Sequence, residues 1–144
     1  MESVSQNKPR IIQLPKICDL RGNLTFVQDM EQVPFEISRV YWTYDVPAGE
    51  FRGGHSHRTA EEVVVASGGS FNVNLFDGEE WVTYTLNRPY QGLYIPSGYW
   101  RTLDNFASGS VCLVMTSTKY DEADYVRDFD EFKRIVSERR NGGV

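Results

Sequence analysis

Short runs of apolar or alternating residues, each ended by turn-forming residues, constrain the fold of this chain more than any other feature. We expect strands near residues 11–14, 24–29, 37–45, 51–57, 61–67, 70–76, 80–86, 92–96, 99–104 and 110–118. Asp77-Gly78 separates two of these runs and predicts a hairpin, because both residues tolerate positive φ. Many short strands at this spacing indicate a β-sandwich or β-barrel rather than an alternating βα fold.

One helix is expected near residues 128–139. Asp128 can cap its first turn, and Gly142-Gly143 can stop it. Four apolar residues recur at helical spacing and share one face: Phe129, Phe132, Ile135 and Val136. The sequence therefore predicts a strand-rich domain that ends in one amphipathic helix.

The length of 144 residues suits one domain. Residues 1–9 are polar and without pattern, so we expect a flexible N-terminal tail followed by a single domain over residues 10–144. Cys18 and Cys112 lie among apolar residues and are expected to be buried free thiols.

Charge and hydropathy exclude several classes of partner. The net charge is −5 and the isoelectric point about 5.0, whereas a nucleic-acid-binding protein needs a basic face. No apolar run approaches the ~20 residues of a membrane span and no secretory signal is visible, so we expect a cytoplasmic protein without a membrane partner. A small anionic ligand stays compatible, because a few arginines in one pocket can bind a diphosphate.

The chain has only two histidines, His55 and His57. On a strand, residues two apart point to the same face, so both rings are expected on one side of the sheet. Their surroundings resemble the first cupin motif, G-x5-H-x-H-x3/4-E-x6-G. The matching positions are Gly49, His55, His57, Glu61 and Gly68, and the register of Glu62 with Gly69 fits equally well.

The second cupin motif, P-x-G-x2-H-x3-N, is matched by Pro96, Gly98 and Asn105, but its histidine is replaced by Arg101. A guanidinium keeps its proton in a protein and cannot ligate a cation. We therefore expect no catalytic metal and no other cofactor. A site of two His and one Glu beside the arginine stays open, since three ligands suffice for some metals.

Without a metal, the histidines are free to transfer protons. The unperturbed pKa of histidine, ~6.5, suits a general base at neutral pH. A neighbouring arginine favours neutral histidine and stabilises a developing oxyanion. This chemistry fits proton abstraction next to a carbonyl, with Arg52, Arg101 and tyrosine hydroxyls as candidate donors to the enolate.

The chain as a whole resembles the dTDP-4-oxo-6-deoxyhexose 3,4-ketoisomerases, the WxcM-like cupins. The matching pieces are DLRGNL at 19–24, PFEISRVY at 34–41, RGGHSH at 52–57, GLY at 92–94, Trp100, YDEADYVR at 120–127 and Phe129-Asp130. Together they span about residues 10 to 135. The resemblance implies an all-β, cupin-type double-stranded jelly roll with one C-terminal helix, assembled as a metal-free homodimer.

The resemblance also implies the reaction. The substrate would be a 4-oxo-6-deoxy sugar on dTDP, whose carbonyl moves from C4 to C3 as a precursor of 3-amino-3,6-dideoxy sugars. His55 and His57 would be the catalytic pair: His55 as the base at C3 and His57 as a proton relay towards C4, or the reverse. The expected substrate-binding residues are Arg21, Tyr41, Arg52, Trp100 and Arg101. Arg101 would lie beside the sugar ring and influence which face of C4 is protonated, but the sequence does not choose between gluco and galacto products.

Other readings stay open. The chain could be a non-catalytic cupin that binds a sugar nucleotide, a metal-dependent cupin oxygenase, or a 3,5-epimerase that also needs a histidine base. Asp121, Glu122 and Asp124 precede the helix and are expected to be structural caps. The aromatic residues Tyr94, Tyr99 and Trp100 are more typical of barrel core than of a base-stacking platform, although one of them could stack on thymine.

Overall fold

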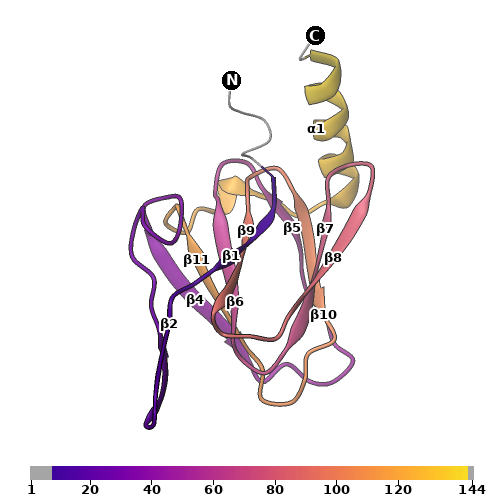
Figure 1. Cartoon of the computed structure of the whole chain (residues 1–144). Coiled ribbons are helices and arrows are strands. Elements are labelled where there is room, and N and C mark those ends of the chain that lie inside the picture. The colour runs from indigo at the N-terminus through magenta and orange to yellow at the C-terminus, as the bar shows by residue number, and fades with distance from the viewer. Residues whose placement is uncertain (1–7, 143–144) are drawn as a thin grey trace.

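Two five-stranded antiparallel sheets face each other in the computed structural model, which describes residues 8–142 (Figure 1). The first sheet has the order β1-β9-β6-β11-β4, with bounds Arg10–Gln13, Gln91–Ile95, Glu62–Gly68, Val111–Thr116 and Arg39–Tyr44. The second has the order β12-β5-β10-β7-β8, with bounds Tyr125–Val126, Arg52–His57, Trp100–Asp104, Phe71–Phe76 and Trp81–Leu86. This arrangement confirms the predicted all-β jelly roll with a C-terminal helix.

The predicted hairpin at Asp77-Gly78 joins β7 to β8. The Asp77 carboxylate accepts hydrogen bonds from the backbone N–H groups of Glu79 and Glu80, at 2.7 and 2.9 Å. Gly78 takes a φ of 110°, whereas Asp77 keeps a negative φ. The turn is therefore closed by a side-chain acceptor and one glycine, and only one of the two expected positive-φ residues is needed.

The main core fills the space between the two sheets. Because successive strand residues point to opposite faces, each strand contributes alternate side chains to this layer. Its buried members are Val64, Ala66, Phe71, Val73, Leu75, Leu86, Leu93, Ile95, Phe106, Cys112 and Val114. Cys112 is buried as expected, but Cys18 is exposed, because its strand lies outside the sandwich.

Two further apolar layers cover the outer faces of the sheets. Val33 and Phe35 lie in the loop before β4 and pack with Val63 and Met115 of the first sheet. Helix α1, Phe129–Gly142, packs Phe132 and Val136 against Phe76, Trp100 and Val126 outside the second sheet.

The start of α1 matches the predicted cap. The Asp128 carboxylate accepts a hydrogen bond of 3.0 Å from the backbone N–H of Asp130. The helix continues past the expected end at residue 139 to Gly142. Gly143, the second half of the predicted stop, lies outside the described residues.

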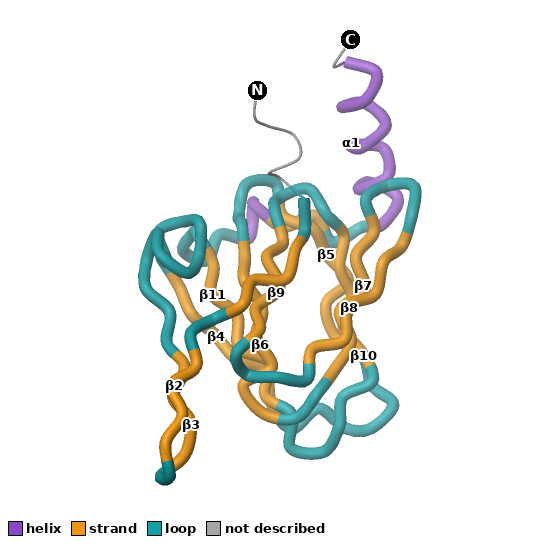
Figure 2. Tube along the Cα trace, in the orientation of Figure 1, coloured by secondary structure: helices purple, strands orange, loops and turns teal. Residues whose placement is uncertain are grey.

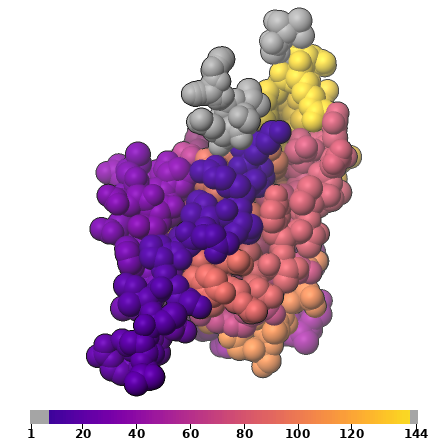
Figure 3. All heavy atoms as spheres, in the orientation of Figure 1, coloured from indigo at the N-terminus to yellow at the C-terminus, as the bar shows by residue number. Residues whose placement is uncertain are grey.

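The hairpin of β2, Lys16–Asp19, and β3, Gly22–Thr25, is the main departure from the predicted strands. It stands away from the sandwich in the ribbon, tube and space-filling views (Figures 1, 2 and 3). Its side chains are almost all exposed, so β2 has no buried face and left no apolar pattern in the sequence. The strand expected over residues 24–29 ends at Thr25. Of the predicted tail, residues 1–7 lie outside the described residues.

The close approach of α1 to the β7–β8 turn generates a stability prediction. A Cβ at Gly78 would meet Val136 Cγ1 at 2.5 Å in a backbone with a φ of 110°. We expect Gly78→Ala to lower the free energy of unfolding by about 2 to 4 kcal/mol, because it combines backbone strain with a clash. Urea titration measures this change.

Gly109→Ala is the matched control, since Gly109 also has a positive φ, of 78°, but an added Cβ there meets nothing within 4 Å. Gly109→Ala should lower the free energy of unfolding by only about 1 kcal/mol, because it adds backbone strain without a clash. Equal losses in the two variants would contradict the packing argument.

Candidate active site

A cavity of about 650 Å³ lies between the two sheets. Its walls come from β4, β5, β6, β10 and β11 and from the segment that leads into α1, and its aliphatic lining is Val64, Val73, Ile95, Leu103 and Val114. The residues that carry polar groups into it are Arg39, Tyr41, Thr43, Arg52, His55, Glu62, Arg101, Tyr120, Tyr125 and Arg127. β4 is an edge strand and does not pair with β5, so the sandwich is open on this side.

The two histidines lie on the same face of β5, as their spacing predicted, with ring centroids 4.9 Å apart in an edge-on arrangement. They occupy different depths. His55 lines the cavity, whereas His57 lies behind it and is only 1% exposed. The ring of Tyr125 contacts both, with centroids at 5.0 and 4.5 Å.

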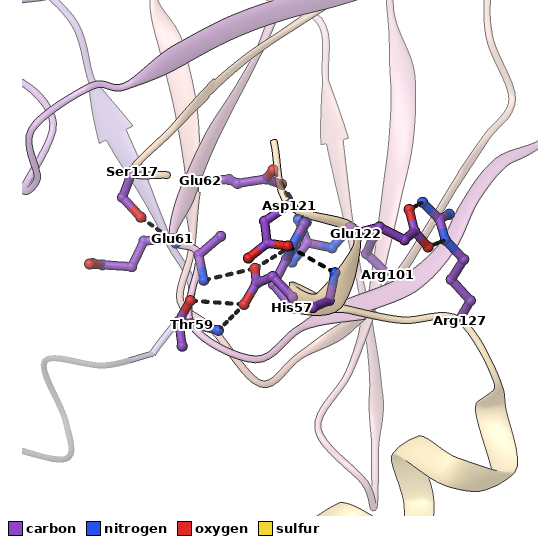
Figure 4. A network of polar contacts seen from close by, with 12 residues as sticks. His57, Thr59, Glu61, Glu62, Arg101, Ser117, Asp121, Glu122 and Arg127 are labelled. Carbon is purple, nitrogen blue, oxygen red and sulfur yellow. Dashed lines mark hydrogen bonds and ion pairs between the residues drawn. The ribbon is translucent and has the colours of Figure 1, made fainter. Parts of the chain in front are cut away.

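His57 is hydrogen-bonded to a residue that the sequence reading had assigned a purely structural role. Its Nδ1 lies 3.0 Å from Asp124 Oδ2. Asp124 also accepts from the Thr59 backbone N–H at 2.7 Å and the Thr59 hydroxyl at 2.8 Å. Figure 4 shows Thr59 and His57 within this network of polar contacts. Burial alone would raise the pKa of this carboxyl, but the hydrogen bonds from Thr59 and His57 lower it.

Of the neighbouring acids, Asp121 is a cap, although of a different helix from the expected one, and Glu122 is not a cap. Asp121 caps the short 3₁₀-helix Glu122–Asp124 by accepting from the backbone N–H of Ala123. Glu122 forms an exposed ion pair with Arg127, with Nε and Oε2 2.7 Å apart. Asp124 was missed because 67 residues separate it from His57 and no spacing rule connects the two positions.

Glu62, not Glu61, is the acid of the site. Glu61 points away from the cavity and accepts a hydrogen bond of 2.6 Å from the Tyr94 hydroxyl. Glu62 is 1% exposed, and its Oε1 accepts from Arg101 Nη1. Its Oε2 lies 3.3 Å from the Tyr41 hydroxyl and 3.4 Å from His57 Nε2. Burial would raise the pKa of this carboxyl, but Arg101 and His57 outweigh it and lower the pKa to about 2.

Arg101 places a positive charge in the lumen. It pairs with His55 across the β10–β5 ladder, is 2% exposed, and has no described hydrogen-bond partner at Nε or Nη2. Burial and the nearby guanidinium lower the pKa of His55 to about 3. The ring of His55 is therefore neutral at physiological pH, and its Nε2 is buried without a partner among the described residues.

Tyr41 completes the polar wall. Burial and the Glu62 carboxylate raise the pKa of its hydroxyl, so it stays a protonated donor. The cavity thus combines a neutral imidazole, a phenol and a guanidinium. This set can accept a proton from carbon and stabilise the oxyanion that forms.

The other predicted substrate-binding residues lie in three different places. Arg52 lines the cavity. Trp100 precedes Arg101 on β10 and so faces the opposite side, where its ring packs against Phe129 and Phe132 at 5.1 and 5.7 Å. The structure does not bring it to the cavity. Arg21 lies on the projecting hairpin, 90% exposed and paired with Asp19 at 2.7 Å.

Several cavity residues were not predicted as site residues from the sequence, and Arg39 is one of them. Arg39 on β4 lies over the rings of Tyr41 and Tyr120, at 5.4 and 5.5 Å. Its Nε is buried without a hydrogen-bond partner in the described part of the chain. The alternation of β4 could have placed it on the same face as Tyr41, because the two residues are two apart.

Over residues 8–142, no group of three or more His, Cys, Asp or Glu side chains is arranged to hold a metal ion. Across the same residues, no helix is long and apolar enough to span a membrane.

The jelly roll, with His55 and Arg101 in its lumen, is a cupin-like fold. The chain matches the FdtA family, described as WxcM-like, C-terminal, over residues 7–137. It is 38% identical over 128 residues to TDP-4-oxo-6-deoxy-alpha-D-glucose-3,4-oxoisomerase of Aneurinibacillus thermoaerophilus, which covers 89% of this chain and 92% of that protein. The chain therefore belongs to the WxcM-like family of sugar 3,4-ketoisomerases and is an isomerase.

Solved structures agree with this assignment. The WlaRB TDP-quinovose 3,4-ketoisomerase from Campylobacter jejuni is 41% identical, with a TM-score of 0.84 over 88% of this chain and 97% of that one. QdtA from Thermoanaerobacterium thermosaccharolyticum, a histidine-to-asparagine mutant in complex with TDP-4-keto-6-deoxyglucose, is 34% identical. Its TM-score is 0.90 over 92% of this chain and 96% of that one.

The lowered pKa of His55 generates a pH prediction. In the unfolded chain this side chain binds a proton below about pH 6.5, whereas in the folded protein it stays neutral down to about pH 3. The unfolded state binds more protons in this window, so stability falls as the pH falls below 6.5. The slope from this one group is at most about 1.4 kcal/mol per pH unit.

His55→Asn removes this contribution. Denaturant unfolding at pH 6.5, 5.5 and 4.5 should show a shallower loss of stability in the variant than in the wild type, since the other acid-sensitive groups are shared. Parallel pH profiles would contradict a neutral, buried His55.

Proposed function

We propose that this enzyme converts dTDP-4-oxo-6-deoxy-glucose to the corresponding 3-oxo-6-deoxyhexose. The observation that carries the proposal is the neutral His55 in the cavity beside Arg101. The relatives support the substrate, because one is named for this sugar nucleotide and another is a complex with it. The product would supply a precursor of 3-amino-3,6-dideoxy sugars.

The proposed reaction begins at C3 of the sugar. His55 Nε2 accepts the C3 proton, the C–H electrons form the C3–C4 double bond, and the C4 carbonyl oxygen becomes an oxyanion. Tyr41 and Arg101 stabilise this enediolate as donors. A proton is then delivered to C4, and the proton of the C3 hydroxyl passes to the C4 oxygen, so that C3 becomes the carbonyl carbon and C4 carries the hydroxyl. No external oxidant is needed, because the carbonyl only changes place.

His57 is proposed as the second proton carrier, although it does not line the cavity. Its Nε2 faces Glu62 Oε2 at 3.4 Å, and the same oxygen lies 3.3 Å from the Tyr41 hydroxyl. A relay from His57 would therefore reach the sugar along the Glu62–Tyr41 edge of the site. Arg101, on the same carboxylate, is proposed to influence the face on which C4 is protonated.

The diphosphate is proposed to lie at the mouth of the cavity. Arg39, Arg52 and Arg127 all line the cavity, and Arg39 has an unpartnered Nε. Guanidinium groups bind phosphate oxygens through paired N–H donors, so this cluster suits an anionic nucleotide despite the acidic net charge of the chain.

A homodimer and a cytoplasmic location stay predictions. The position of Arg21 supports the dimer: its hairpin projects into solvent, and the neighbouring Leu20 is fully exposed. If Arg21 binds substrate, as the family resemblance implies, the hairpin must reach the cavity of a second copy. We therefore propose that Arg21 acts on the substrate of the partner subunit.

His55→Asn tests the base. Because an asparagine cannot take up the C3 proton, we expect turnover to fall about 10²- to 10⁴-fold with substrate binding largely kept. NMR of dTDP-4-oxo-6-deoxy-glucose in deuterated water measures both C3 exchange and the product. Wild-type protein that binds the nucleotide without C3 exchange would instead indicate a non-catalytic binder.

Mixed dimers test Arg21. Arg21→Ala and His55→Asn should each be inactive alone, because each homodimer has two incomplete sites. If Arg21 serves the partner's cavity, unfolding and refolding the two variants together should produce heterodimers with one intact site and measurable turnover. Activity of Arg21→Ala equal to the wild type, or a mixture that stays inactive, would contradict this arrangement.

A further inference from the structure

The two ring nitrogens of His57 both face carboxylates. Nδ1 lies 3.0 Å from Asp124 Oδ2, and Nε2 lies 3.4 Å from Glu62 Oε2. The side chain has no exposed surface, and the rings of His55 and Tyr125 pack against it at 4.9 and 4.5 Å. The ring therefore has little freedom to rotate, and its protonation pattern is set by these neighbours.

Asp124 is held more firmly than the ring it contacts. Its Oδ1 accepts from the backbone N–H and the hydroxyl of Thr59, and its Oδ2 accepts from the backbone N–H of Ala60 at 3.3 Å. An ionised carboxylate can only accept hydrogen bonds. All of these donors come from the turn that follows β5, the strand that carries His57 itself.

From this geometry we infer that Asp124 is a positioning residue that fixes His57 in the tautomer with the proton on Nδ1. Because the carboxylate accepts from Nδ1–H, the exchangeable position of the ring is Nε2, the nitrogen directed towards Glu62 and the cavity. Of the two carboxylates, Asp124 is the closer, at 3.0 Å from Nδ1 against 3.4 Å between Glu62 and Nε2, so its hydrogen bond decides the tautomer. Asp124 thus selects which edge of His57 takes up and releases a proton.

The functional consequence rests on the proposed ketoisomerase, but the tautomer itself does not. With Nδ1–H fixed, His57 can serve the relay at the Glu62 edge. With the single ring proton on Nε2 instead, this nitrogen would have no free lone pair to take up a proton at that edge. Asp124 would then act on catalysis without contacting substrate.

Asp124→Asn tests the inference, because it keeps the shape of the side chain and replaces an acceptor oxygen by an amide donor. With its oxygen retained by Thr59, the asparagine presents N–H to His57 Nδ1 and shifts the ring proton to Nε2. The chain has only two histidines, so ¹⁵N-histidine labelling yields spectra of just two rings. His57→Gln and His55→Asn assign them.

We expect wild-type His57 to show a protonated Nδ1, and Asp124→Asn to show a protonated Nε2 with kcat about 10²-fold lower and KM little changed. Thr59→Val is the matched control, since it removes one hydrogen bond from Asp124 without touching His57. It should lower the melting temperature but keep the Nδ1–H tautomer and most of kcat.

Three results would overturn the inference: an unprotonated Nδ1 in the wild type, an unchanged tautomer in Asp124→Asn, or an equal loss of kcat in Thr59→Val. If Asp124→Asn does not fold, His57→Asn keeps a donor at the Nδ1 position and lacks Nε2. This variant should keep its folding stability, but its turnover should be slow. Wild-type protein with the expected tautomer but no isomerase activity would refute the proposed function and leave the positioning role intact.

Discussion

A row of buried polar groups, Arg101–Glu62–His57–Asp124, holds the site together. Glu62 and Arg101 are each nearly inaccessible to solvent, and an isolated buried charge costs several kcal/mol. Each member is tolerated because the next one compensates it. The row also joins β6, β10, β5 and the segment before α1, which are far apart in the sequence. Removing one partner would therefore leave an uncompensated charge in the interior and loosen several elements at once.

The same row explains why the two histidines differ although they share a strand face. His57 has a carboxylate at each nitrogen, whereas His55 has Arg101 nearby and packs against the rings of His57 and Tyr125. Burial and a positive neighbour both disfavour imidazolium, so His55 is left neutral. One strand thus provides two imidazoles with opposite electrostatic surroundings, which is the arrangement that separate proton-transfer roles require.

Much of this could be predicted from the sequence because it follows from local rules. The spacing of His55 and His57 predicted that both rings lie on one face of the strand. Asp77-Gly78 predicted the hairpin turn, and Asp128 predicted the start of the helix. Register and long-range contacts were harder. A one-residue shift separates Glu61 from Glu62, and only the strand pairing decides which one faces the lumen. Trp100 and Arg101 are adjacent on a strand and point to opposite faces, so only one of them can face the cavity. Asp124 and the exposed β2–β3 hairpin depend on tertiary contacts that no short pattern encodes.

Strand β10 has Trp100 on one side under α1 and Arg101 on the other side in the cavity. Phe129 and Phe132 of the helix pack on Trp100, so α1 supports the outer face of the strand whose inner face carries the guanidinium. We therefore expect a change of Phe132 or Val136 to be felt in the cavity as well, because one peptide unit joins the residue under the helix to the guanidinium on the other face of the sheet.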